Sequence, residues 1–69
     1  MNKIQSPYLT QIEAAEFLRL SPRSLERHRL AGTGPKFVAA GRRRLYRVAD
    51  IEAWALARTF SSTSEIDEA

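Results

Sequence analysis

Two helix-start signals and one helix-stop signal fall within a single short stretch of this sequence. Thr10 is followed three residues later by Glu13. This is the spacing of a capping box, in which the hydroxyl accepts from a helix amide and the carboxylate accepts from the cap residue's own N–H. Ser21 followed by Pro22 is a second start, because serine caps well and proline at the first helical position sacrifices no useful N–H. Gly32 stands where a left-handed residue ends a helix. The stretch therefore predicts two short helices joined by a tight turn.

The two helices are expected over about residues 11–19 and 22–31. Apolar residues recur at helical spacing along the first of them, at Ile12, Ala15 and Leu18. Ala14 and Ala15 are small, so the second helix can cross closely over them. In that second helix Leu25 is expected to point into the core.

Two helices joined by a turn of about three to four residues form a helix-turn-helix unit, whose second helix enters a groove of DNA. Taken alone, the stretch leaves an ordinary helical hairpin open as the alternative. With Leu25 facing the core, Arg23 and Arg27 lie on the outer side of the second helix, flanked by Ser24. Guanidinium groups one turn apart suit guanine readout, although solvated surface arginines are the alternative. His28 leans toward the core, and we expect it to be a half-buried packing residue rather than a phosphate contact or a metal ligand.

After a turn-rich connector, two β-prone runs surround a glycine. Strands are expected at residues 37–39 and 44–47, joined through a loop that contains Gly41. This hairpin carries consecutive arginines at its tip and descending arm: Arg42, Arg43 and Arg44. Such residues contact phosphates without reading sequence. A charged strand edge that discourages aggregation is the alternative.

Arg44 conflicts with the simple strand pattern. Alternation places Arg44 on the same face as Tyr46. If Tyr46 packs inward, either Arg44 extends outward to solvent along its aliphatic stem or the strand carries a bulge.

A third helix is expected from about Ala49. No good cap precedes it, but Asp50 and Glu52 lie in its first turn and suit the positive end of the helix dipole. Ile51, Trp54 and Ala55 keep helical spacing. Trp54 is expected to be the largest core residue, surrounded by Leu18, Leu25, Phe37 and Tyr46.

Most of the chain resembles a known family. The resemblance is to excisionase/AlpA-type helix-turn-helix proteins, relatives of the MerR DNA-binding domain, and it rests on Leu9-Thr10, Glu13-Ala14-Ala15, Leu18, Ser21-Pro22-Arg23, Leu25, Gly32, Gly41-Arg42-Arg43, Tyr46-Arg47, Asp50-Ile51 and Trp54. It implies a mostly α fold, a winged helix-turn-helix of three helices plus a two-stranded wing, over residues 8–58. Residues 1–7 are expected to form a flexible arm, and residues 59–69 a disordered acidic tail. The recognition helix, about 22–31, would lie in the major groove and the wing, 37–47, on the backbone or minor groove. The DNA-binding residues expected are Arg23, Ser24, Arg27, Arg42, Arg43, Arg44 and Arg47.

The charge distribution agrees with a nucleic-acid partner. Between Arg19 and Arg47 lie nine basic residues and one acid, Glu26, a balance of +8, whereas the segment from Thr59 onward carries −3. The chain has no cysteine and one histidine, so we expect no disulfide and no metal site. No apolar run has the length of a signal-peptide core or a membrane span. We expect a cytoplasmic protein with no membrane partner.

No nucleophile–base pair, carboxylate dyad or phosphate-cradling glycine motif is evident, so we expect neither catalytic residues nor a cofactor. The leading hypothesis is a sequence-specific binder of double-stranded DNA. The alternative is a protein–protein adaptor whose arginines engage an acidic partner. The resemblance implies either a transcription regulator or an excisionase of a mobile element, with a recombinase (integrase) or RNA polymerase as further partner. Because a single DNA-binding module buries only about 600–1,000 Å², we expect a free monomer that self-associates cooperatively on repeated DNA sites.

Overall fold

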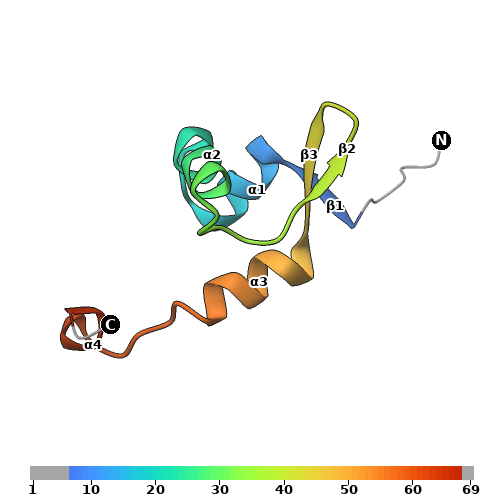
Figure 1. Ribbon diagram of the computed structural model, residues 1–69. Helices are drawn as coiled ribbons and strands as arrows, with labels where there is room; N and C mark the ends of the chain where they lie inside the picture. Colours follow the sequence, from blue (N-terminus) through green and yellow to red (C-terminus); the bar gives the residue numbers. More distant parts are fainter. Residues whose placement is uncertain (1–6, 68–69) are drawn as a thin grey trace.

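The computed structural model describes residues 7–67 (Figure 1). Its elements, in chain order, are β1 (Tyr8–Thr10), α1 (Gln11–Leu18), α2 (Pro22–Ala31), β2 (Val38–Ala40), β3 (Arg43–Arg47), α3 (Val48–Leu56) and α4 (Thr63–Asp67). In the ribbon view α2 and the tip of the β2–β3 hairpin lie on the same side of the molecule, with α3 on the other. The architecture is the predicted winged helix-turn-helix: α1 and α2 are the helical pair and the hairpin is the wing.

The predicted caps are formed. Thr10 Oγ1 accepts from the Glu13 amide at 3.1 Å, and Glu13 Oε1 accepts from the Thr10 amide at 2.9 Å. Ser21 Oγ accepts from the Ser24 amide at 3.1 Å. Gly32 ends α2 in the left-handed region, with φ of 76°. The helix boundaries therefore follow directly from local side-chain chemistry.

Helix α1 ends one residue earlier than predicted. Arg19 is its C-cap and adopts a left-handed conformation, with φ of 61°. Its amide donates to the Glu16 carbonyl, and the Leu20 amide donates to the Ala15 carbonyl. These bonds satisfy carbonyls at the helix end, so an arginine here takes the role usually filled by glycine.

The sheet has three strands where the sequence predicted two. All neighbours are antiparallel in the order β1-β3-β2, so β3 is the central strand. Strand β1 is the additional strand, and it places Leu9 opposite Tyr46. The predicted N-terminal arm falls mainly on residues 1–6, which lie outside the described part of the chain.

The wing turn is set by a glycine. Ala40 pairs with Arg43, which leaves Gly41 and Arg42 as a two-residue loop. Gly41 has φ of +63°, whereas Arg42 does not have positive φ. This matches a type II′ hairpin, which takes glycine at its first central position. With this turn, β2 begins one residue later than predicted and β3 begins one residue earlier.

Five side chains from α1, α2, β3 and α3 form the buried core, which comprises Ala14, Ala15, Leu25, Tyr46 and Ile51. Leu9 and Leu18 pack against it. The two alanines confirm the prediction that α1 presents a small surface to α2. Tyr46 packs inward, which is the condition under which Arg44 was expected either to extend outward or to lie at a bulge.

Three residues, one from the predicted apolar face of α1 and two predicted for the core, are less buried than expected. Ile12 is 68% exposed and Phe37 is 42% exposed. Ile12 and Leu18 are separated by about 120° around a helix of 3.6 residues per turn, so only one of them faces the core. Trp54 is half-buried, and Tyr46, Leu25 and Ile51 are the largest fully buried side chains instead.

The third helix begins at Val48, one residue before its predicted start, and its N-cap Arg47 makes no side-chain capping bond. Beyond it, residues Thr63–Asp67 form the short helix α4, so the prediction of a disordered tail is wrong for this segment. The serine- and threonine-rich stretch before α4 supplies residues favoured at helix starts.

In the part of the chain that the structure describes, no helix has the length and apolar character needed to cross a membrane.

Candidate nucleic-acid interface

Helix α2 presents two arginines on its outer face. Arg23 and Arg27 are both exposed and, four residues apart, share one face of the helix. Ser24 is half-buried, and its hydroxyl oxygen accepts from Ser21 Oγ at 2.9 Å. The start of α2 is held against α1 by Gln11, whose Nε2 donates to the Pro22 carbonyl at 3.3 Å. The two arginines thus project from a helix with a fixed start.

The wing arginines divide into two kinds. Arg42 and Arg43 are exposed, and neither pairs with another described residue. Arg44 is half-buried, and its Nη1 donates to the Gly41 carbonyl at 3.0 Å and to the Arg43 carbonyl at 3.2 Å. The strand pairing is continuous through Arg44, so the strand has no bulge there. The guanidinium folds back onto the turn and stiffens the wing tip.

Arg47 stands apart from the other predicted DNA contacts. It ends β3, at the opposite end of the strand from the wing turn, and its Nε lies 2.8 Å from Asp50 Oδ2. The hydrogen bond and charge of Asp50 raise the pKa of Arg47 above its ordinary value. The structure therefore does not bring Arg47 together with the wing-tip arginines.

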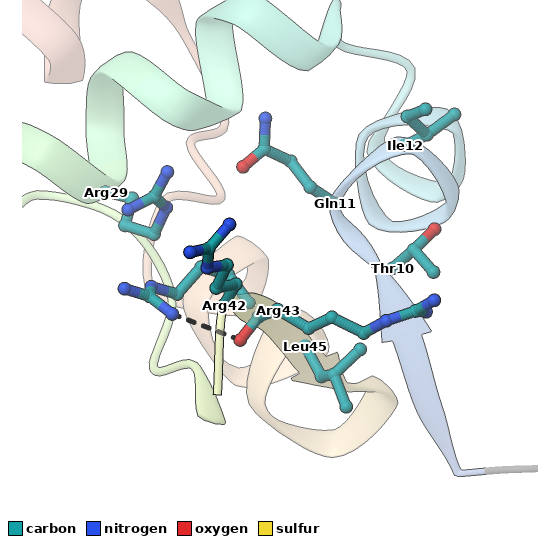
Figure 2. Close-up of a pocket in the computed structure, with 8 residues that line it drawn as sticks. Thr10, Gln11, Ile12, Arg29, Arg42, Arg43 and Leu45 are labelled. Carbon is teal, nitrogen blue, oxygen red and sulfur yellow. Dashed lines mark hydrogen bonds between the residues drawn. The ribbon is translucent and has the colours of Figure 1, made fainter. Parts of the chain in front are cut away.

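A groove connects the wing to the helical pair. Its volume is ≈ 360 Å³, and it is lined by residues 10–12 at the start of α1, Arg29 of α2, and residues 42–45 of the wing. Figure 2 shows Arg29 reaching from α2, and Arg42 and Arg43 from the wing, around this opening. Arg29 was not among the predicted site residues, because its position on the helical wheel is close to that of Leu25. The one signal for it in the sequence is its place within the arginine-rich segment.

A second cluster supports the end of α2. The His28 ring is half-buried and lies edge-on to the Trp54 ring, with centroids 5.3 Å apart. His28 Nδ1 is 2.8 Å from Thr33 Oγ1. Trp54 Nε1 donates to the Thr33 carbonyl at 2.9 Å. These contacts confirm His28 as a packing residue, and they join α3 to the connector that follows α2.

These features define a helix-turn-helix protein with a basic wing. A family of helix-turn-helix domains, within the excisionase/AlpA-like group, matches residues 8–59 of the sequence. The chain belongs to this family of DNA-binding domains. A search of curated proteins finds no significant match.

Proposed function

We propose that this protein is a sequence-specific binder of double-stranded DNA, with α2 in the major groove and the β2–β3 wing on the backbone or in the minor groove. One observation carries the proposal. Four arginines on α2 and the wing tip are exposed and have no ion-pair or hydrogen-bond partner among the described side chains: Arg23, Arg27, Arg42 and Arg43. A surface of uncompensated guanidinium groups attracts a polyanion.

The two groups of arginines have different roles in this proposal. Arg23 and Arg27 project from one face of a helix, and a guanidinium can donate two hydrogen bonds to the O6 and N7 atoms of guanine. Arg42 and Arg43 lie on a hairpin turn, where contacts to phosphates add affinity without reading sequence. Ser24 is expected to donate its hydroxyl hydrogen to a phosphate of the DNA backbone. Arg44 is expected to support the shape of the wing rather than to contact DNA.

At the level of biology, we propose a regulator of transcription or an excisionase of a mobile element. Several copies would bind neighbouring repeated sites and contact one another there, because one module gives modest discrimination against a genome of competing sites. A recombinase or RNA polymerase would be the further partner. The family match supports DNA binding and leaves both roles open.

Selection of bound duplexes from a random pool tests the proposed function. Purified protein is incubated with the pool in the presence of excess unrelated duplex, and retained molecules are amplified and sequenced over several rounds. Enrichment of one short motif is expected. If no motif is enriched while an acidic polypeptide such as polyglutamate competes as well as DNA, the adaptor function is correct and DNA recognition is rejected.

A further inference from the structure

Helix α4 carries an exposed apolar side chain and lies apart from the other elements. Figure 1 shows α4 standing clear of the rest of the molecule, at the end of the linker that follows α3. In the described part of the chain it makes no extensive contact with another helix or strand, and Ile66 is 52% exposed. Isolated helices shorter than about 12 residues are marginal in water, and α4 has five residues. Helix α4 is therefore expected to gain stability when Ile66 packs against another surface.

A small pocket with an apolar lining lies where the connector after α2 meets α3. Its volume is ≈ 280 Å³, below the range of about 300–1,000 Å³ that holds drug-sized ligands, so it suits one side chain and its immediate neighbours. The apolar lining comes from both the connector and α3, and it comprises Pro35, Ala53, Trp54 and Ala57. We call this site the α3 pocket.

The α3 pocket carries two positive charges that no carboxylate compensates. Lys36 lines it, is exposed, and has no ion-pair partner among the described side chains. Arg58 also lines it, lies over the Trp54 ring, and donates to backbone carbonyls, which leave its charge in place. The carboxylate in the lining belongs to Asp50, which is paired with Arg47 at 2.8 Å. The pocket is therefore complementary to an apolar group with acidic neighbours.

The C-terminal segment of this chain has that chemistry. The sequence places Ile66 among three carboxylates, Glu65, Asp67 and Glu68. An aliphatic side chain between acids matches an apolar pocket with two cations, because both the apolar contact and the charges are complementary. In its own chain α4 stands clear of the body, so a second copy has to supply the occupant.

We propose that the α3 pocket binds α4 of a second copy of this chain, with Ile66 entering the pocket. This inference rests on the proposed function for its role, because it assigns the contact between copies bound at neighbouring DNA sites. None of the proposed DNA contacts lines the pocket, so α4 and DNA do not compete for the same residues. One aliphatic anchor gives weak association in free solution, but two copies held on one duplex reach effective concentrations of about millimolar.

The first test follows the free protein, without DNA. Trp54 is the one tryptophan of the chain, so its indole N–H gives a single nuclear magnetic resonance signal from within the pocket. Spectra of the isotope-labelled full chain are recorded over a dilution series from millimolar to micromolar concentration. The indole signal should move progressively with concentration in the wild-type protein and should stay fixed in Ile66→Ser.

The matched control for this series is Leu56→Ser. Leu56 is 75% exposed and belongs to α3 without lining the pocket, so its variant loses a similar apolar group elsewhere and should behave as wild type. A wild-type signal that does not depend on concentration would overturn the proposal. A signal that responds to Ile66→Ser but not to dilution would place α4 in the pocket of its own chain and reject the second copy.

Charge reversal tests whether the contact is direct. Lys36→Glu should abolish the concentration-dependent shift, because the pocket would then repel the acidic segment. Adding Glu65→Lys and Asp67→Lys to the same chain reverses the partner segment as well, and part of the shift should return. No recovery in the triple variant would contradict the pairing of this segment with Lys36.

The second test uses duplexes that carry one or two copies of the selected site. The wild-type protein should fill the second site about tenfold more tightly than the first, a coupling of ordinary size. Ile66→Ser and Lys36→Glu should bind the single site as wild type does and lose the coupling. Coupling that survives in Ile66→Ser would reject the contact while DNA binding stands. If no duplex is selected but the indole signal moves as expected, the contact between copies stands and the proposed function fails.

Discussion

The indole N–H of Trp54 donates to the backbone carbonyl of Thr33 across 2.9 Å. The same carbonyl accepts from Arg58 Nη2 at 2.9 Å, and the Arg58 guanidinium lies over the Trp54 ring at 4.4 Å from its centre. Trp54 belongs to α3, and Thr33 follows Gly32, the residue that caps the end of α2. The orientation of α2 therefore depends on a half-buried tryptophan at the edge of the core.

This arrangement predicts a graded response at Trp54. Trp54→Phe keeps an aromatic ring against His28 but loses the hydrogen bond, and it should lower the free energy of unfolding by about 1 kcal/mol. The Thr33 carbonyl keeps its Arg58 donor, which limits the loss. Trp54→Ala should cost more, up to the about 3–5 kcal/mol typical of removing a buried aromatic side chain. Urea unfolding followed by circular dichroism measures both; equal losses for the two variants would contradict the account.

Gly32 offers a test of backbone strain without steric clash. Its φ is 76°, and a Cβ added there meets no atom within 4 Å. Gly32→Ala should therefore destabilise the fold by about 1–2 kcal/mol through the left-handed conformation alone. Gly32→Asn should cost less, because asparagine tolerates that conformation. Thermal unfolding compares the two, and an alanine variant as stable as wild type would show that α2 ends differently in solution.

Tyr46 should carry a pH-dependent contribution to stability. Burial raises the pKa of its hydroxyl above the ordinary 10.0, and the charge of Arg29 partly opposes the increase. The folded state thus holds the proton more tightly, so stability is full below about pH 10 and is lost as pH rises above the unfolded pKa. Tyr46→Phe should remove this alkaline loss.

At neutral pH the same variant should have the stability of wild type to within about 1 kcal/mol, because the buried hydroxyl makes only a weak hydrogen bond, to Arg29. Urea unfolding at pH 7 and at about pH 10.5 gives both values. A clear loss of stability for Tyr46→Phe at pH 7 would mean that the hydroxyl makes a strong hydrogen bond in solution.

The two arginine groups should respond differently to substitution. Arg27→Ala should cost about 1–3 kcal/mol on the selected duplex and less on random DNA. Arg43→Ala should weaken both duplexes similarly and reduce the slope of affinity against salt by about 0.9, because one fewer counterion is released. Fluorescence anisotropy titrations at several salt concentrations give these values. Equal losses of affinity on both duplexes for Arg27→Ala would contradict the assignment of base recognition to α2.

Features that depend on residues close in sequence could be predicted. The caps at Thr10 and Ser21 each join a side chain to an amide three residues away, so the sequence alone is enough to predict them. The glycine stop at Gly32 is equally local, as is the small Ala14–Ala15 surface under α2. Together these features define the helical pair and its crossing.

Features that depend on contacts between residues far apart in the sequence could not be predicted. The strand at Tyr8–Thr10 forms only because β3 is available to pair with it, and three residues carry too little pattern to reveal this. Arg44 turns back to the Gly41 carbonyl, a bond that requires the turn geometry. Arg29 becomes part of a site only when the wing folds alongside α2.

The most direct test of the central claim is the ratio of two equilibrium affinities. Fluorescence anisotropy at one fixed salt concentration compares the duplex recovered by selection with a scrambled duplex of the same length and composition. A sequence-specific binder should prefer the selected duplex by a factor of about 10³ or more. A ratio near one at every salt concentration would contradict sequence recognition by α2 and leave only a general attraction of the basic surface for polyanions.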